Sequence, residues 1–367
     1  MTSYGYFVYN LALDDLAGGH SWKQGDWLIN SMSGPVRRSL TGNVLIWISD
    51  ALMMDPVRVV IIAQSLIVGV LYLLTVWMVF TSPRDLVRLI LAMSPAFFMT
   101  FWIADPLGSA RKEMFAFIAL LVFSQGLGRN NAALGILGSL LFVLAVAIHE
   151  AMILFAPVFW AILFLTRSKV SDANLQTIVL GMACLVATAV FLDALGQGQV
   201  EDFMNVCQPL LDRGVKEHMC HGSIKWLEFD LAYGVESVAS RTTLNAVFLL
   251  TLTYAICLLP SAYVVYLSER RAVSLVLLLS PIFCFLPLFF IAVDHGRWIS
   301  FHIFAGLVLC SAALSQGQMR IVRRPNTWVL LILGLASLLF APTHIRDVYW
   351  GGVVRRALEE LTPLLLS

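Results

Sequence analysis

Charged side chains are scarce in this chain. Lys, Arg, Asp and Glu make up 13% of its 367 residues, 59% are hydrophobic, and the mean hydropathy is +0.83. Soluble domains have about 25% charged residues and about 45–50% apolar ones. So few charges cannot cover a globule with so large a core, and repeated apolar runs near about 20 residues match the bilayer's hydrocarbon thickness. The composition therefore predicts an all-α polytopic membrane protein, with residues 1–367 forming one integral membrane domain.

Several functional motifs are also missing. The sequence has no HExxH, no CxxC and no P-loop, so we expect neither a metal site nor ATP hydrolysis, and no cofactor. The net charge of +1 gives no reason to expect nucleic acid as a partner. The start, residues 1–16, contains two aspartates and lacks a basic n-region, so no cleavable signal peptide is predicted. Tyr4–Leu13 is compatible with the end of a helix that begins upstream.

The six cysteines divide by their surroundings. Four lie inside apolar runs and resemble small buried hydrophobes, namely Cys184, Cys257, Cys284 and Cys310. Cys207 and Cys220 share one polar loop, where a disulfide is expected if the loop faces an oxidising compartment. His218 and His221 flank Cys220 and suggest zinc as an alternative, but too few ligands are nearby, so the disulfide is preferred.

Apolar runs between charged, glycine or proline interruptions predict about ten membrane spans. Their expected bounds are Val57–Phe80, Asp85–Ala104, Arg111–Gln125, Ala132–Ile148, Ala151–Leu165, Thr177–Gly196, Thr242–Leu267, Ala272–Val293, Ile299–Leu314 and Trp328–Phe340. A polar segment, 18–55, precedes them, and its part Leu40–Met54 is typical of an amphipathic interfacial helix. Gln197–Arg241 is a long polar loop, and an amphipathic tail, 345–367, ends the chain.

Basic residues in alternate connections set the orientation. Short loops rich in Lys and Arg stay in the cytoplasm. With ten spans, one side receives Arg84, Arg88, Arg129, Arg167, Lys169, Arg270, Arg271, Arg320, Arg323 and Arg324. The opposite side is then exoplasmic, the periplasm of a bacterium, with both termini and the Cys207/Cys220 loop. We therefore expect a multi-pass protein of the bacterial inner membrane.

The remaining unusual charges are predicted to gather on the periplasmic side. They are Asp26, Arg37, Arg38, Asp105, Arg111, Lys112, Glu113, His149, Glu150, Asp294, His295 and Arg297. Charges at membrane depth cost about 2.5–3.5 kcal/mol each on insertion scales, so they are rare unless paired or functional. His302, alone on an apolar run one turn after this set, is expected to be a core histidine.

This set suggests chemistry on a phosphate. A carboxylate from Asp26, Asp105, Glu113, Glu150 or Asp294 would act as general base, with Glu150 and Asp26 first in line. His149 would orient the base or bind sugar. The arginines and Lys112 would hold a phosphate leaving group, since the guanidinium fork donates bidentate hydrogen bonds. Structural alternatives remain open: a solvated loop for Asp26, headgroup anchors for Arg37 and Arg38, an ordinary polar helix start for Arg111–Glu113, a satisfied pair for His149–Glu150, and a helix-capping salt bridge for Asp294–Arg297.

Four short motifs resemble bacterial Wzy-type and EpsG-type polysaccharide polymerases and related multi-span glycosyltransferases that use lipid-linked sugars (GT-C-like). These are GPVRRSLTG after an outer GDW, ARKE opening a span, HE at a helix start, and DHGRW. The resemblance implies undecaprenyl-diphosphate-linked sugars as substrates at the periplasmic face. It also implies that Arg37, Arg38, Arg111 and Arg297 engage the diphosphate.

The expected function is therefore transfer or polymerisation of sugars from polyprenyl (di)phosphate carriers, in the synthesis of O-antigen, capsule or exopolysaccharide. The expected partners are the lipid-linked saccharide, membrane lipid and other polysaccharide assembly proteins. A transporter or flippase is the alternative, and it predicts ionisable groups near the bilayer midplane and two related halves. A non-catalytic assembly subunit, whose outer charges bind a partner, is the third hypothesis.

Overall fold

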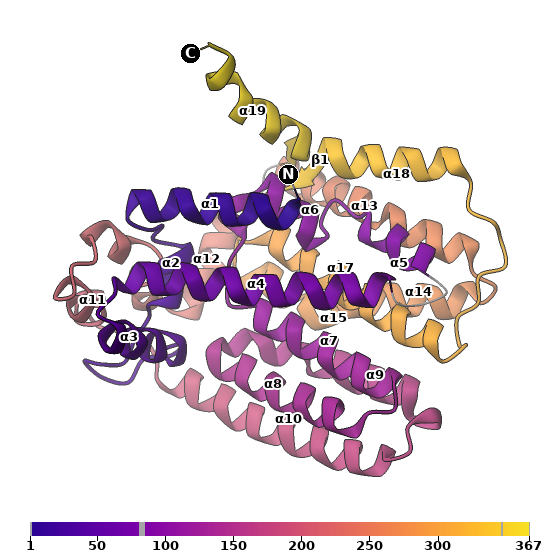
Figure 1. The fold of residues 1–367 in the computed structure, drawn as a ribbon, viewed down its shortest axis with the longest axis horizontal. Coiled ribbons are helices and arrows are strands. Elements are labelled where there is room, and N and C mark those ends of the chain that lie inside the picture. Colours follow the sequence, from indigo (N-terminus) through magenta and orange to yellow (C-terminus); the bar gives the residue numbers. More distant parts are fainter. Residues whose placement is uncertain (1, 81–84, 346–347, 367) are drawn as a thin grey trace.

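The computed structural model describes residues 2–80, 85–345 and 348–366, and it is almost entirely helical. Most long helices run side by side along the longest dimension of the molecule (Figure 1). They are α1 (Ser3–Ala17), α4 (Pro56–Phe80), α7 (Met114–Gly128), α8 (Ala132–Ile148), α9 (Ala156–Thr166), α10 (Ala173–Gly196), α13 (Leu244–Leu267), α17 (His295–Ser315) and α18 (Thr327–Leu339).

Six helical segments of the described chain are long and apolar enough to cross a membrane. They are Pro56–Phe80, Glu150–Lys169, Ala173–Gly196, Leu244–Leu267, Arg271–Ile291 and His295–Ser315. Three other predicted spans correspond to the shorter apolar helices α7, α8 and α18. The helical architecture and the membrane-compatible helices are thus as predicted, while the count of ten spans stays a prediction.

Prolines interrupt two of the predicted spans. Asp85–Ala104 is not one helix, because the chain leaves helical geometry between α5 (Asp85–Ala92) and α6 (Phe98–Ala104), around Pro95. Residues 271–291 form three pieces, α14 (Arg271–Leu279), α15 (Pro281–Phe285) and α16 (Leu288–Ile291). Proline has no N–H to donate and its ring clashes with the preceding turn, so helices break there.

Helix α17 forms the centre of the bundle. Every residue from His295 to Leu314 is buried, although the segment is apolar enough to cross a membrane. It contacts α7, α9, α13 and α14. At its middle the ring of Phe304 stacks on Phe117 of α7, with centroids 4.1 Å apart. Other parts of the protein therefore surround α17 on all sides. This packing fixes the position of its charged first turn.

One end of the bundle collects the basic connections, and we call it the basic end (129–131, 167–172, 268–271 and 316–324). Arg129 lies 3.7 Å from the centroid of the Trp77 ring. Nζ of Lys169 donates to the Gln316 carbonyl at 3.3 Å, and the Glu269 N–H donates to the Arg320 carbonyl at 2.9 Å. Arg88 is buried nearby and donates to the Met78 carbonyl, whereas Arg84 lies outside the described residues. The predicted gathering of these loops at one end is confirmed. The compartment that they face stays a prediction.

The opposite end is covered by short helices, which we call the cap (α2, α3 and residues 197–230). α2 (Lys23–Trp27) and α3 (Leu40–Leu52) come from the polar segment before α4, and α3 matches the predicted amphipathic helix. α11 (Phe203–Leu211) and the 3₁₀ turn η4 (Glu217–His221) come from the long loop, which continues into α12 (Leu231–Arg241). Figure 1 shows α2, α3 and α11 together at this end.

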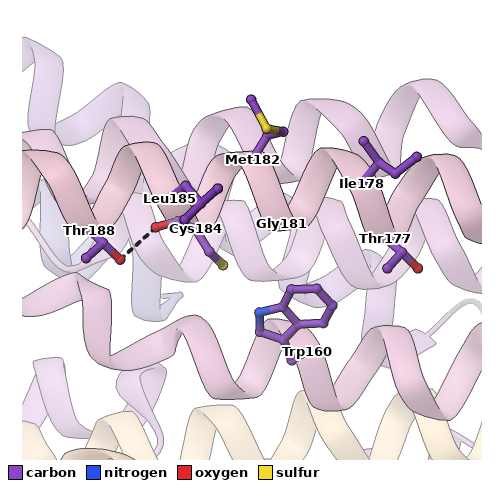
Figure 2. A pocket seen from close by; sticks show the side chains of 8 residues that line it. All are labelled: Trp160, Thr177, Ile178, Gly181, Met182, Cys184, Leu185 and Thr188. Carbon is purple, nitrogen blue, oxygen red and sulfur yellow. Dashed lines mark hydrogen bonds between the residues drawn. The ribbon is translucent and has the colours of Figure 1, made fainter.

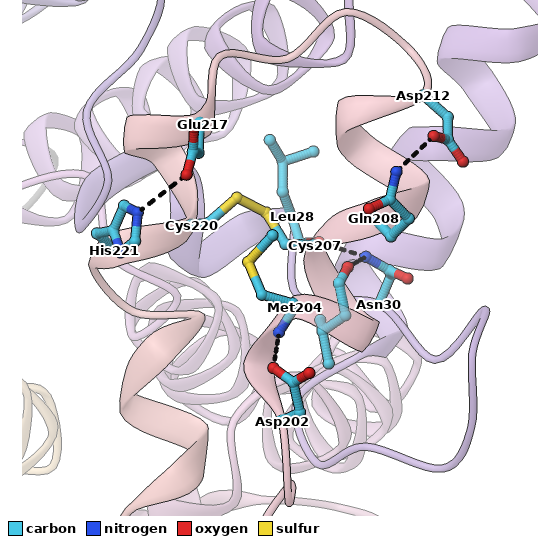
Figure 3. Close-up of a disulfide and its surroundings, with 11 residues drawn as sticks. Leu28, Asn30, Asp202, Met204, Cys207, Gln208, Asp212, Glu217, Cys220 and His221 are labelled. Carbon is cyan, nitrogen blue, oxygen red and sulfur yellow. Dashed lines mark hydrogen bonds and ion pairs between the residues drawn. A yellow bond between two sulfur atoms is a disulfide. The ribbon is translucent and has the colours of Figure 1, made fainter.

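The predicted disulfide between Cys207 and Cys220 is present in the cap, with Cα atoms 5.8 Å apart. It joins α11 to η4 over buried side chains of both segments (Figure 3). Asn30 donates to the Val206 carbonyl at 2.9 Å and so ties the disulfide lobe to the N-terminal segment. His218 contacts the Gly19 carbonyl instead of a thiol, and no group of three or more possible metal ligands occurs among the described residues.

The C-terminal part packs against α6 and α13. Two short strands, β1 (Phe340–Pro342) and β2 (Val348–Trp350), pair antiparallel before α19 (Gly352–Leu366). The predicted amphipathic tail is thus a strand followed by a helix, and α19 contacts α6. Gly296, in the first turn of α17, lies so close to the Thr343 carbonyl that a Cβ would stand 2.1 Å from it. Only glycine permits this crossing.

Candidate functional site

The structure brings most of the predicted charged residues together at the cap end. Two buried ion pairs lie there. The charged and polar side chains that take no part in these ion pairs lie beside them. We call the whole set the charge cluster: Asp26, Arg38, Arg111, Lys112, Glu113, His149, Glu150, Asp294 and Arg297. All nine are at most partly exposed, and seven of them are buried.

The first ion pair joins Arg38 to Glu150 across 112 residues of sequence. Nε of Arg38 donates to both carboxylate oxygens at 2.9 Å, and Nη2 donates to Oε1 at 2.5 Å. Arg38 adopts a left-handed backbone conformation with φ 64. Both oxygens of Glu150 are occupied, so this carboxylate is poorly placed to accept a proton from a substrate.

His149 precedes Glu150 at the end of α8. Its Nδ1 accepts from the Ala151 N–H at 3.3 Å and stands 3.7 Å from Glu150. Burial, followed by repulsion from Arg38, lowers the pKa of His149 to about 3. The ring is therefore neutral near pH 7, and the contact with Glu150 is not an ion pair at that pH.

The second ion pair centres on Arg297 in the first turn of α17. Its Nε and Nη2 donate to the two oxygens of Glu113 at 3.1 and 2.9 Å, and its Nη1 donates to Asp294 at 2.6 Å. The predicted cap between Asp294 and Arg297 is thus present, but Glu113, 184 residues away, is the buried partner. All three guanidinium nitrogens are engaged.

Two cations next to the ion pairs have no carboxylate partner among the described residues. Lys112 is fully buried and its Nζ donates to the Arg38 carbonyl at 2.8 Å. Burial lowers the pKa of Lys112 to about 8. Arg111 donates to the Trp22 carbonyl and to Oγ of Ser223, and its Nε is buried without an acceptor. Both keep hydrogen-bonding capacity and charge for a ligand.

Asp26 is the carboxylate of the cluster that the protein does not engage. It is 5% exposed, yet within residues 2–80, 85–345 and 348–366 it accepts no hydrogen bond and forms no ion pair. Burial raises its pKa, but the charges of Lys112 and Arg111 outweigh this effect, so the pKa lies below the ordinary value. Asp26 is therefore an ionised, buried and unengaged carboxylate beside two cations.

Three predicted residues lie at the edge of the cluster or apart from it. Arg37 points to the cap, where it donates to the Phe229 carbonyl at 3.3 Å. Both oxygens of Asp105 are engaged, by the ring and backbone of His344 and by the Gly108 N–H, so it acts as a structural clamp. His295 contacts the Phe289 carbonyl at 3.3 Å and stacks on the Phe289 ring.

His302 behaves as the predicted core histidine. It is buried in α17, with one ring nitrogen against the Tyr254 hydroxyl and the other 2.6 Å from the Leu278 carbonyl. The predicted start of a span at Arg111 is wrong by three residues, because α7 begins at Met114. Arg111–Glu113 instead form a turn before the helix, and this turn lets the three side chains point in different directions.

A hydrogen-bonded support for this turn was not foreseen. Ala110 has a left-handed backbone with φ 60, and its carbonyl accepts from the Trp27 indole at 2.8 Å and from the Gln64 amide at 2.9 Å. Gln24 in turn donates to Gln64 at 2.9 Å. Gln64 is a fully buried amide within an apolar helix. A polar residue inside a predicted span was the sequence signal that could have indicated this support.

Comparison with protein-family models, with curated proteins and with solved structures gives no match to this chain.

Replacing Gln64 with Leu should destabilise the turn that holds Arg111 and Lys112. The substitution leaves the Gln24 amide with Asp14 as its remaining acceptor and removes one donor from the Ala110 carbonyl, which costs about 1–3 kcal/mol for buried groups. Thermal unfolding of the purified protein in detergent measures this as a lowered midpoint. Ser65→Ala is the control, because the Ser65 hydroxyl donates to the Ile61 carbonyl of its own helix and the backbone carbonyl that accepts from Tyr4 is kept. Equal stability of Gln64→Leu and Ser65→Ala would contradict the supporting role.

Proposed function

We propose that this chain transfers or polymerises sugars from polyprenyl-diphosphate carriers at the outer face of a bacterial inner membrane, in surface polysaccharide synthesis. The observation that supports this most is the unengaged, buried Asp26 beside Lys112 and Arg111. A diphosphate needs cations that are free to donate to it, and sugar transfer needs a carboxylate that is free to accept a proton.

The pairing pattern divides the cluster into two roles. Arg38 with Glu150 and Arg297 with Glu113 neutralise each other and hold segments from four parts of the chain in place. Arg111 and Lys112 are the cations without a carboxylate within the described chain, so they are the groups proposed to bind the diphosphate. Glu150 is fully engaged by Arg38, and for this reason we assign the base to Asp26.

The proposed step is a displacement at the anomeric carbon of the donor sugar. Asp26 takes the proton of the acceptor hydroxyl, and the hydroxyl oxygen forms a bond to that carbon. The bond between the anomeric carbon and the diphosphate oxygen breaks, and its electron pair leaves with the polyprenyl diphosphate. Arg111 and Lys112 stabilise this developing charge. Bound diphosphate offsets the cations that hold the pKa of Asp26 low, so the carboxylate becomes a stronger base once the donor is in place.

The proposed sidedness follows from the two ends of the bundle. The basic end is assigned to the cytoplasm by the positive-inside rule. The cap, with its Cys207–Cys220 disulfide, then lies in the oxidising periplasm, where such bonds persist. Most charges of the cluster lie at helix ends and turns, which favours a transferase over a transporter with a pathway through the midplane.

Replacing Asp26 with Asn should abolish long surface polysaccharide in a deletion strain that expresses the variant. Loss of a general base lowers the rate by about 10²–10⁴-fold. Chain length on a gel measures the effect, at membrane levels matched to wild type. Glu217→Gln, an exposed carboxylate of the same cap, is the control and should leave chains unchanged. Normal chains with Asp26→Asn would refute the assignment of the base.

Binding of undecaprenyl diphosphate should weaken as the pH rises through about 8, because Lys112 is charged below its pKa and neutral above it. A lost charge-assisted contact corresponds to roughly tenfold in affinity. Native mass spectrometry of the purified protein from about pH 7 to about pH 9.5 measures the change. Lys112→Arg keeps its charge over this range and should flatten the profile. Identical profiles for the two proteins would contradict the role of Lys112.

A further inference from the structure

Four aromatic side chains lie together on the cap and the first turn of α12, and we call them the aromatic platform: Trp22, Trp226, Phe229 and Tyr233. Trp22 precedes α2, and Trp226 belongs to the 3₁₀ turn η5 (Lys225–Glu228). The ring centroids of Trp22 and Trp226 are 5.8 Å apart, and those of Trp226 and Tyr233 are 5.6 Å apart. Phe229 stacks on Tyr233 at 4.1 Å. The N-terminal segment and the long loop thus share one continuous set of rings.

The platform contacts arginines at two places. The Trp22 carbonyl accepts from Arg111, whose guanidinium carbon is 5.9 Å from the centroid of the Trp22 ring. Ser223 donates to the same carbonyl at 3.0 Å and accepts from Arg111 at 3.3 Å. At Phe229 the carbonyl accepts from Arg37 at 3.3 Å, and Nε of Arg37 finds no acceptor within the described chain. The platform is therefore joined to the charge cluster by direct contacts with Arg111.

Three platform residues carry polar atoms that the protein does not use. Over the ranges 2–80, 85–345 and 348–366, the indole N–H groups of Trp22 and Trp226 and the hydroxyl of Tyr233 donate to no acceptor. The buried indoles of Trp27 and Trp298, in contrast, donate to backbone carbonyls. Trp22 is 38% exposed and Tyr233 is 40% exposed. These side chains thus combine accessible apolar rings with available hydrogen-bond donors.

A saccharide has the chemistry that matches this surface. The C–H bonds on one face of a sugar ring are attracted to the negative face of an aromatic ring, and the hydroxyl groups at its rim accept from indole N–H groups. Successive platform rings are spaced by about the length of one sugar residue. The exposed Asp230 adds an acceptor for sugar hydroxyls, because its Oδ1 caps α12 and its Oδ2 accepts no hydrogen bond from the described residues.

Exposed tryptophan and tyrosine side chains also occur at membrane interfaces, where they contact lipid headgroups. Trp160 is a comparison for that role, because it is 38% exposed, as Trp22 is, and lines a groove of about 510 Å³ between α9 and α10 (Figure 2). The lining of this groove contains no second aromatic residue and no charged one. Several adjoining rings with arginines at two of them therefore favour a saccharide as the ligand of the platform.

We propose that the aromatic platform binds the saccharide of the lipid-linked substrate, with its sugars over Trp22, Trp226 and Tyr233. The inference rests on the proposed function for the attachment of this saccharide to a diphosphate at Arg111, and it deepens that function by assigning a subsite for the sugars. The sugar next to the diphosphate lies at Trp22, and the following sugars extend toward Tyr233. The platform contributes affinity and takes no part in the bond changes.

The first experiment uses the unaltered full-length protein in lipid nanodiscs. The probe is the mixture of oligosaccharides that partial acid hydrolysis releases from the host's own surface polysaccharide. Hydroxyl-radical labelling, mapped by mass spectrometry, should modify Trp22, Trp226 and Tyr233 without the probe and should modify them less with it, while Trp160 stays shielded by lipid. Labelling of the platform as low as that of Trp160, without a response to the probe, would identify a membrane-contacting belt and overturn the proposal.

The second experiment measures affinity for the same probe by isothermal titration in detergent. Trp226→Ala should weaken binding at least about tenfold, because it removes a ring that contacts the sugar and an available donor. Trp226→Phe keeps a ring and should retain most of the affinity, which distinguishes a lost contact from unfolding. Trp160→Ala is the control and should bind as the unaltered protein does. An unchanged affinity of Trp226→Ala, or an equal loss with Trp160→Ala, would overturn the proposal.

These outcomes are separable from the proposed function. If Asp26→Asn leaves the polysaccharide intact while Trp226→Ala loses the oligosaccharides, the transferase proposal fails and the saccharide site stands. If Asp26→Asn abolishes the polymer while Trp226→Ala binds the oligosaccharides normally, the saccharide site fails and the transferase proposal stands.

Discussion

The ion pair between Arg38 and Glu150 is the interaction on which the cap end depends. Both side chains are largely removed from water, and a buried charge is tolerated only when a partner compensates it. The pair fastens the polar N-terminal segment to the junction after α8, and Lys112 then bonds to the Arg38 carbonyl. The pair of Arg297 with Glu113 adds the central helix α17 to the same network. Four separate stretches of sequence are held together by these few contacts.

Ion pairs neutralise some charges of the cluster, and the remaining charges are available to a ligand. If every cation at the cap end had a carboxylate partner, the site would be a structural salt-bridge network and nothing more. Instead Arg111 and Lys112 donate to carbonyls and a hydroxyl, and Asp26 stays ionised in their field. Such a set is costly to bury without a ligand, and the turn at Ala110, supported by Trp27 and Gln64, maintains it. Because these unengaged charges are costly to bury, ligand binding explains them better than a contribution to the stability of the fold does.

The general architecture could be predicted from composition and spacing, because apolar runs and basic connections can be read directly along the sequence. The same rules predicted that twelve charged residues gather on one side, and nine of them form the charge cluster. The disulfide followed from two cysteines in one polar loop. The choice of partners could not be predicted. Arg38 bonding to Glu150 while Asp26 stays unengaged depends on side-chain directions in a turn with left-handed residues, and the role of His344 as the partner of Asp105 depends on the C-terminal strand crossing. The breaks near Pro95, Pro281 and Pro287 were not predicted, because Asp85–Ala104 and Ala272–Val293 were each expected to be one continuous span.

The most direct test is an electron cryomicroscopy structure of the full chain with undecaprenyl diphosphate bound in a lipid nanodisc. The account predicts diphosphate density within hydrogen-bonding distance of Arg111 and Lys112 with Asp26 adjacent, while the Arg38–Glu150 and Arg297–Glu113 pairs remain intact. Diphosphate density at the basic end, or an empty cap end at saturating lipid, would contradict it.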